Sequence, residues 1–207
     1  MSPLPRYAAL TTLPDGYHIV DRLTLENPRT LLRLNAWGIA LLIAGYVGLA
    51  AYRGALQAGG ISGQDPFSGV TGWGTLALTL LGLFVMLSVH ELVHGLAFQG
   101  FGAKPHYGFS LQKGVAYASA KNYYLTRDAY IVVGLAPLFV LTAAFMALMI
   151  PFGGNTRELL IIVGAANIGG CVGDLWFWLS CRRQPPTSLV RDYGDGAELY
   201  APVFSSV

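Results

Sequence analysis

Charged residues are scarce in this chain. Asp, Glu, Lys and Arg together make up 12% of the 207 residues, whereas 54% of the residues are hydrophobic. A typical soluble domain carries about 25% charged residues, so this composition argues against an ordinary soluble protein and favours one embedded in a membrane. The formal net charge of +2 gives no reason to expect nucleic acid, since basic residues beside membrane spans account for it.

Cysteine is also rare, with Cys171 and Cys181 as the only two. Ten residues along one helix correspond to about 15 Å, which is beyond the reach of a disulfide. We therefore predict that both cysteines pack as free thiols. The chain lacks a Cys-x-x-Cys pair that would indicate a second metal site. It also lacks a Ser-His-Asp or Cys-His arrangement that would indicate a covalent nucleophile.

The chain contains four long apolar segments, at residues 34–52, 73–101, 130–150 and 159–179. Each can supply the ~20 residues needed to cross ~30 Å of hydrocarbon. The predicted fold class is therefore an all-α membrane protein with about four transmembrane helices. The sequence contains no internal repeat of the kind that would indicate an inverted-repeat transporter. Glycines within these segments are expected to permit close helix packing; they are Gly45, Gly48, Gly164, Gly169, Gly170 and Gly173.

Basic residues alternate in number between the regions that flank these segments. Along the chain the regions hold 4, 1, 4, 1 and 3 of the 13 Lys and Arg residues. Positive charge is retained on the cytoplasmic side of a membrane. The pattern predicts a multi-pass protein of the cell membrane with both termini in the cytoplasm.

Three regions are expected. Residues 1–30 lack an apolar run that could serve as a signal peptide, and form a cytoplasmic segment with a short strand at Tyr17–Val20. Residues 31–183 form the transmembrane domain, and residues 184–207, rich in Pro and Gly, form a partly disordered cytoplasmic tail.

A small β-hairpin is predicted in the cytoplasmic loop between the second and third spans. Its strands are residues 107–112 and 115–119, joined by a turn at Lys113 and Gly114. An exposed edge of this hairpin could bind a substrate as an added strand. The alternative is a hairpin that merely packs on the membrane surface.

The second span carries the chemistry, in the motif His90-Glu91-Leu92-Val93-His94. Residues four apart project from one face of a helix, so the two imidazoles can bind one zinc ion. Glu91 lies beside that face and can act as the general base that takes a proton from water as it attacks a carbonyl. The alternative is that His90 and His94 only form hydrogen bonds with neighbouring helices.

A third protein ligand is expected, because two imidazoles do not complete a tetrahedral zinc site. The candidates are His18, His106, Asp128 and Asp174. The position of a metzincin's third histidine is occupied by Gly100, which excludes that class. Asp174 is the best candidate, because it and His94 both lie about 9 Å from the cytoplasmic end of their spans. His106 follows Lys104-Pro105, where proline ends the helix, but it could still lie near the site.

Four stretches resemble a family of membrane zincin peptidases and, more distantly, the site-two proteases. They are HELVHGLAFQGFGAKPHYGF, AYAS, GLAPLFV and NIGGCVGDLWFW. The resemblance implies zinc bound by His90, His94 and Asp174, with Glu91 as the catalytic base. It also implies supporting roles for Pro137, in the Gly134–Pro137 motif, and for Asn167. Here the ligand motif reads Gly-Asp-Leu, whereas site-two proteases have Leu-Asp-Gly.

The expected function is that of a zinc-dependent metalloprotease that hydrolyses peptide bonds within the membrane or at its surface. Its partners would be the lipid bilayer and a membrane protein or peptide substrate, without nucleic acid. The alternatives are a non-catalytic membrane metal-binding scaffold, a transporter-like protein, and a zinc hydrolase of a lipid or small amide.

Overall fold

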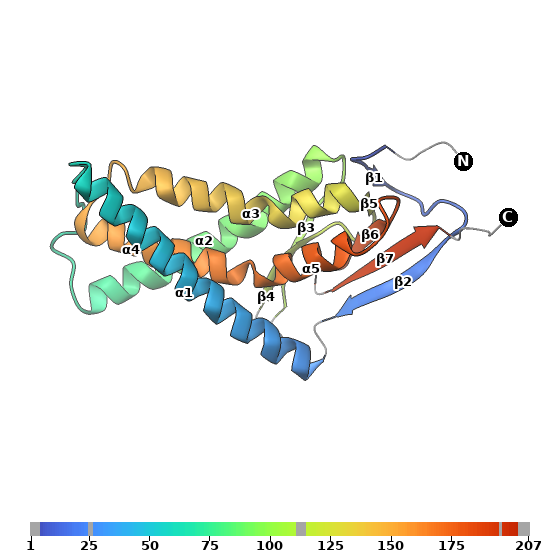
Figure 1. The fold of residues 1–207 in the computed structure, drawn as a ribbon, viewed down its shortest axis with the longest axis horizontal. Helices are drawn as coiled ribbons and strands as arrows, with labels where there is room; N and C mark the ends of the chain where they lie inside the picture. The colour runs from blue at the N-terminus through green and yellow to red at the C-terminus, as the bar shows by residue number, and fades with distance from the viewer. Residues whose placement is uncertain (1–4, 25–26, 111–114, 195, 203–207) are drawn as a thin grey trace. The chain divides into compact units, whose positions relative to one another are not determined.

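The computed structural model describes residues 5–24, 27–110, 115–194 and 196–202. Helices dominate these residues (Figure 1). The helices are α1 (Pro28–Ala58), α2 (Trp73–Gly100), α3 (Arg127–Leu148), α4 (Gly154–Gly170) and α5 (Val172–Arg182). The strands are β1 (Ala9–Leu10), β2 (Tyr17–Thr24), β3 (His106–Ser110), β4 (Val115–Ser119), β5 (Tyr124–Thr126), β6 (Leu189–Asp192) and β7 (Gly196–Pro202).

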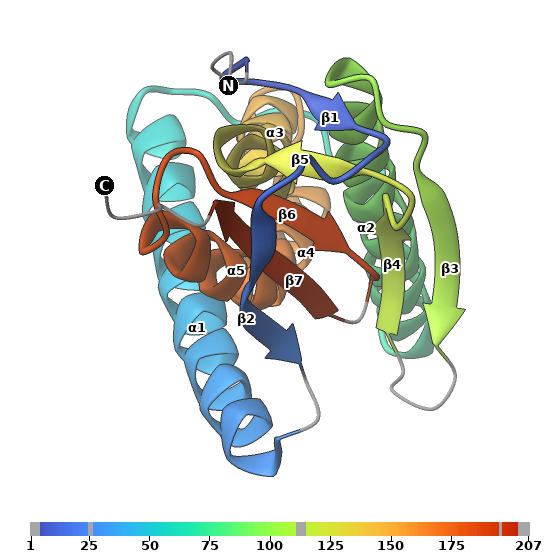
Figure 2. The ribbon, with the colours of Figure 1, turned by 90° about the vertical axis from the view of Figure 1, so that its right-hand side faces the viewer.

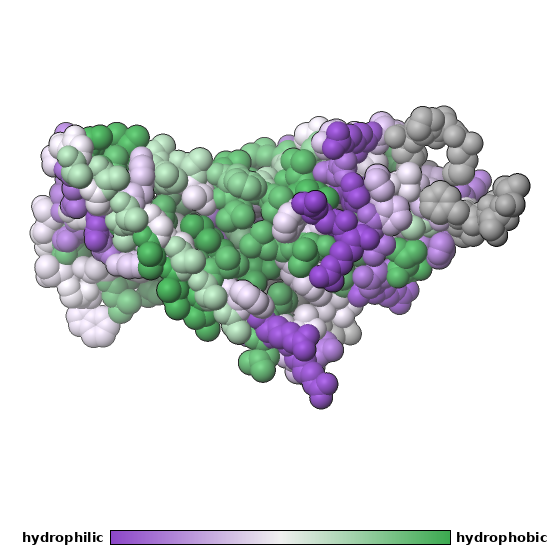
Figure 3. All heavy atoms as spheres, in the orientation of Figure 1, coloured by the Kyte–Doolittle hydropathy of each residue, from purple (hydrophilic) through white to green (hydrophobic). Residues whose placement is uncertain are grey.

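Four helical stretches are long and apolar enough to cross a membrane: α1, α2, α3, and α4 continued by α5. The four apolar segments predicted from the sequence are thus confirmed as helices. Their large hydrophobic side chains are exposed, for example Ile39 (61%), Phe84 (69%) and Phe139 (66%). Figure 3 shows hydrophobic residues gathered over α1 and α3. A continuous apolar surface of this kind is suited to lipid rather than to water.

The fourth span is interrupted beside Asp174. Helix α4 ends at Gly170, Cys171 takes up φ −67° and ψ 3°, and α5 begins at Val172. The five residues from Gly169 to Gly173 include three glycines, which disfavour a continuous helix. The interruption places Asp174 in the first turn of α5, where the helix dipole stabilises a negative charge.

The chain divides into two compact units, and helices α2 and α3 each contribute to both. One unit consists of residues 33–90 and 137–172, and we call it the helical unit. The other consists of residues 1–32, 91–136 and 173–207, and we call it the sheet unit.

Glycines bring α1 and α4 close together in the helical unit. A Cβ atom at Gly169 would lie 2.8 Å from the Cβ of Leu42 and 3.0 Å from the carbonyl oxygen of Gly38, and one at Gly45 would lie 3.0 Å from Ile168. Gly164 is similarly confined by Leu49. The expectation of close packing is confirmed at Gly45, Gly164 and Gly169. It is wrong at Gly48, Gly170 and Gly173, where an added Cβ would meet nothing within 4 Å.

The neighbours Gly169 and Gly170 provide a matched test of this packing. Gly169→Ala forces α1 and α4 apart, and overpacking of this kind costs roughly 1–3 kcal/mol. Gly170→Ala meets no atom and should leave stability unchanged or slightly raised, because alanine favours a helix. Thermal unfolding of the detergent-purified variants measures both effects. Equal melting temperatures for the two variants would contradict the proposed contact.

A five-stranded antiparallel sheet forms the centre of the sheet unit, in the order β1-β5-β6-β7-β2 (Figure 2). The longest pairing joins β2, from the N-terminal segment, to β7, from the C-terminal tail. Leu125, Val190 and Leu199 are fully buried on one face of the sheet. They pack in a core with Phe98 of α2 and Val133 of α3. The sheet therefore fixes the segments of α2 and α3 that belong to this unit.

This sheet corrects the sequence-based prediction of an all-α chain with a single hairpin. The predicted strand at Tyr17–Val20 exists but extends to Thr24. The prediction of partial disorder after Gln184 is wrong for the described residues, because β6 and β7 lie there. Except for β6 and β7, which pair as neighbours along the chain, the strands of this sheet find their partners far away in sequence, so no local pattern announces the sheet. The cytoplasmic location of both segments stays a prediction, as does the division at residues 30 and 183.

The two strands of the predicted hairpin are present. β3 and β4 pair antiparallel, with His106 opposite Ser119 and Gly108 opposite Tyr117. The predicted turn at Lys113 and Gly114 lies outside the described residues. The cytoplasmic placement of the hairpin stays a prediction.

Candidate metal centre

Helix α2 carries the three residues of the predicted motif. Its run from Trp73 to Gly100 has no Asp, Lys or Arg, and Glu91 is its single acidic residue. His90 and His94 lie one helical turn apart and project from the same side. Both are buried, with 7% and 8% of their surface exposed. Two polar rings buried in so apolar a helix need partners, because an unsatisfied polar group there is costly.

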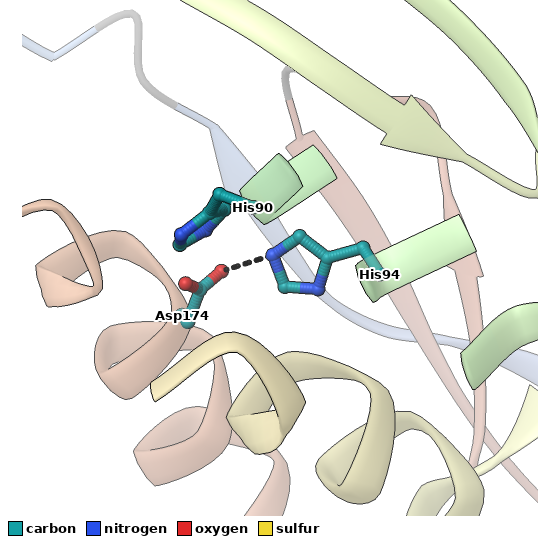
Figure 4. A group of neighbouring side chains, drawn as sticks. All are labelled: His90, His94 and Asp174. Atoms are coloured by element: carbon teal, nitrogen blue, oxygen red, sulfur yellow. Dashed lines mark ion pairs between the residues drawn. The ribbon is translucent and has the colours of Figure 1, made fainter. Parts of the chain in front are cut away.

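His90, His94 and Asp174 each offer one ligand atom, and these atoms lie within 4.8 Å of one another (Figure 4). His94 Nε2 is 3.3 Å from Asp174 Oδ1. Zinc bonds of about 2.0–2.2 Å in tetrahedral geometry place neighbouring ligand atoms about 3.4 Å apart. The spacing of His94 and Asp174 therefore matches that of two ligands on one zinc ion.

The other nitrogen of His94 determines which of its forms is present. His94 Nδ1 lies 2.9 Å from the carbonyl oxygen of Val133 in α3. A carbonyl can only accept, so Nδ1 must carry the proton and donate it. In the neutral ring, Nε2 then presents a lone pair toward Asp174, which is the form that binds a metal.

A chain of two hydrogen bonds determines the form of His90 in the same way. The Pro137 carbonyl accepts a hydrogen bond of 3.4 Å from Nδ2 of Asn167, so the amide must turn its oxygen the other way. That oxygen lies 3.0 Å from His90 Nδ1. His90 therefore donates its Nδ1 proton to Asn167. Pro137 and Asn167 thus orient a histidine, in agreement with the supporting roles that the resemblance implies.

These arrangements leave electron pairs facing one another. Without a cation, the lone pair of neutral His94 Nε2 would oppose an oxygen of the Asp174 carboxylate. Either a proton on the ring or a metal ion must lie between them. Two imidazole nitrogens and one carboxylate oxygen form a donor set that suits zinc and leaves a position open for a reactant. The residues present therefore fit the predicted metal.

The other candidates for the third ligand lie elsewhere. His106 is exposed at the start of β3, and His18 is exposed on β2. Asp128 pairs with Arg6 at 2.8 Å and with Arg127 at 2.7 Å. Among the described residues, Asp174 is thus the candidate that the fold brings to both histidines. It comes from the fourth span, as the argument from depth in the membrane expected.

Comparison with protein families agrees with this geometry. Residues 83–189, just over half of the chain, match a family model described as "Putative zincin peptidase". The chain belongs to this family. No curated protein and no solved structure matches this chain. The matched residues of this zincin family member contain His90, Glu91, His94 and Asp174, together with the helices that position them.

The C-terminal strands of this zincin family member carry a further carboxylate, in the sheet unit, to which sequence reasoning gave no role. Asp192, at the end of β6, accepts a 2.6 Å hydrogen bond from the Tyr130 hydroxyl of α3 and another of 2.6 Å from the Gly194 amide. Burial raises the pKa of Asp192 to about 6, against these hydrogen bonds, which favour the charged form.

Strand β3 contacts α2 next to the motif. The Tyr107 hydroxyl lies so close to Gly95 that a Cβ there would be 1.8 Å from it. Gly95 directly follows His94, and a larger side chain at this position would require the exposed tyrosine to move. The contact places the hairpin beside the part of α2 that carries Glu91 and His94.

Substitution of Asn167 tests the orientation of His90. In Asn167→Ala the His90 ring loses the acceptor of its Nδ1 proton and can rotate. Removal of such an outer hydrogen bond typically weakens metal binding about 10- to 100-fold. Competition with a chelator measures the zinc affinity, and Asn122→Ala, at an exposed turn, serves as the control. Equal affinity in the two variants would show that Asn167 does not orient His90.

Proposed function

We propose that this chain is a zinc-dependent metalloprotease that hydrolyses peptide bonds within a membrane or at its surface. One observation carries the proposal. Two buried histidines of one apolar helix each bring a ligand nitrogen within 4.8 Å of the other and of an Asp174 oxygen, and Glu91 adjoins them in a chain of zincin type. A purely structural site would need the ligands but not the glutamate.

Each residue has a distinct task in this proposal. His90, His94 and Asp174 hold the ion, which when bound supplies a Lewis acid that polarises a carbonyl and acidifies water. Glu91 is partly exposed and interacts electrostatically with His94. It takes a proton from the attacking water and returns it to the leaving amine. Val133 and Asn167 keep the two imidazoles in the tautomer that can bind the metal.

The four apolar helices and the distribution of basic residues support the membrane setting. With both termini cytoplasmic, His94 lies about 9 Å inside the cytoplasmic boundary and His90 one turn deeper. Water must then reach the site from the cytoplasmic side. This supports a membrane protein or peptide as the substrate, because a bond near that depth is presented by chains that enter the bilayer.

The hairpin is the proposed substrate handle. Tyr107 anchors it next to His94, and hairpin edges bind extended peptides through backbone hydrogen bonds. An extended backbone is also what hydrolysis requires, since the carbonyl of a helical segment is already hydrogen-bonded.

Elemental analysis of the detergent-purified protein is the decisive experiment. The parent and Glu91→Gln should each hold about one zinc per chain. His94→Ala and Asp174→Ala should lose it, because each removes a ligand. Cleavage of a fluorogenic transmembrane peptide in lipid vesicles should fall by about 100-fold or more in Glu91→Gln, since a general base contributes that much.

Other outcomes favour the alternatives. A parent that holds no zinc under zinc-replete conditions contradicts the protease. If His94→Ala loses zinc but Asp174→Ala retains it, the third ligand is a residue other than Asp174, and His106 is the next to test. Zinc without hydrolysis in any lipid composition supports a scaffold, and metal flux across vesicles supports transport.

A further inference from the structure

A partly open cavity of about 310 Å³ lies between the first halves of α2 and α4, within the helical unit. Its lining includes Thr75 and Thr79 of α2 and Asn155, Glu158 and Leu159 of α4. Farther along, the two helices touch at Gly82, where a Cβ atom would lie 3.0 Å from Val163. The cavity is therefore the space that α2 and α4 leave on the N-terminal side of this contact.

The polar side chains of the cavity present acceptors for hydrogen bonds. The Thr79 hydroxyl donates to the Thr75 carbonyl at 2.8 Å, and the Thr75 hydroxyl donates to the Val70 carbonyl at 3.2 Å. The side-chain nitrogen of Asn155 donates at 3.3 Å to a carbonyl of the preceding loop. Because these donors are engaged by the backbone, the two hydroxyl oxygens and the amide oxygen are left to accept from a ligand.

Glu158 adds a carboxylate to the same wall. The Tyr46 hydroxyl donates to Oε1 at 2.7 Å, and the Arg53 guanidinium pairs with Oε2, while the Glu158 side chain stays 35% exposed. Each carboxylate oxygen can accept more than one hydrogen bond. Among the described residues that line the cavity, none is Lys, Arg or His. An anionic group therefore finds no cationic partner in the lining, whereas a group with several donors finds several acceptors.

The cavity lies where the two spans begin. Gly72 of its lining directly precedes α2, and Asn155 is the second residue of α4. Trp73, the first residue of α2, is 83% exposed, and tryptophan collects at the boundary between hydrocarbon and lipid headgroups. Leu76 and Leu80 follow on α2 and are 46% and 58% exposed. A headgroup in the cavity would thus have apolar side chains next to its acyl chains.

The size and position of the cavity disfavour a helical or extended substrate segment. One turn of α-helix with its side chains, ~10–12 Å across and 5.4 Å long, fills roughly 400–600 Å³, which exceeds the cavity. The contact at Gly82 also closes the space about 12 Å before His90, so a peptide held here would not continue to the candidate metal centre. A volume equal to roughly ten water molecules suits a lipid headgroup.

We propose that this cavity binds the ammonium headgroup of a phospholipid of the phosphatidylethanolamine type. The three N–H donors of that group match the oxygens of Thr75, Thr79, Asn155 and Glu158, and hydrogen bonds from a charged donor are stronger than those between neutral groups. The inference concerns the helical unit alone. It does not depend on zinc or on proteolysis.

The test is native mass spectrometry of the delipidated full-length protein in detergent, titrated with short-chain phosphatidylethanolamine. Phosphatidylcholine with the same acyl chains is the matched ligand, because its headgroup carries the same charges but no N–H donor. We expect phosphatidylethanolamine to bind at least about tenfold more tightly, since hydrogen bonds to charged groups contribute roughly 1.5–3 kcal/mol each. Phosphatidylglycerol, which is anionic, should bind more weakly than phosphatidylethanolamine.

Thr79→Val removes one acceptor and keeps the shape of the side chain. It should weaken the binding of phosphatidylethanolamine about tenfold and leave that of phosphatidylcholine unchanged. Ser88→Ala is the control, because the Ser88 hydroxyl makes the same kind of bond within α2, to the Phe84 carbonyl at 3.0 Å, but does not line the cavity. Its affinity for both lipids should equal that of the parent.

Equal affinity for phosphatidylethanolamine and phosphatidylcholine would overturn the inference, as would a preference for phosphatidylglycerol. Parental binding in Thr79→Val, or an equal loss in Ser88→Ala, would place the lipid elsewhere on the protein. If Thr79→Val does not fold, Thr75→Val decides by the same criteria. A dimer that Thr79→Val dissociates would show that a second copy of the chain, and not a lipid, occupies the cavity.

Discussion

The hydrogen bonds on the far side of the two imidazoles are the interactions on which the rest of the site depends. Buried in an apolar helix, His90 and His94 must each satisfy two ring nitrogens. The Val133 carbonyl and the Asn167 amide each take one Nδ1 proton. Because those acceptors come from α3 and α4, both rings keep one form and one direction. The second nitrogen of each ring can then act as a ligand atom together with Asp174.

The interruption at Cys171 serves the same end. A helix that continued unbroken through Asp174 would have no free amides at that point, whereas the start of α5 offers the first turn of a helix to the carboxylate. Glycine has a low helix propensity, so breaking the helix at this stretch loses little free energy. Gly169 also lets α1 approach α4 closely. One glycine-rich stretch thus combines tight helix packing with a new helix end beside the site.

The sheet shows how the two ends of the chain contribute to a centre that lies in the middle of the sequence. β2 pairs with β7 along its length, and the core beneath them holds parts of α2, α3 and α5. The sheet thereby supports the segments that carry His94, Val133 and Asp174.

The sequence alone determined the long apolar segments and the spacing of His90, Glu91 and His94, and from these it predicted a membrane protein with a zinc centre. These properties depend on composition and on spacing along one helix, which are local: four residues between His90 and His94 suffice to place both rings on one side. The pairing of β2 with β7, the hydrogen bond of Tyr130 with Asp192 and the packing of Tyr107 on Gly95 were decided by the tertiary structure. Each joins segments distant in sequence through short strands or single side chains. Such contacts leave no periodic trace, because the stabilising surface exists only once the chain has folded.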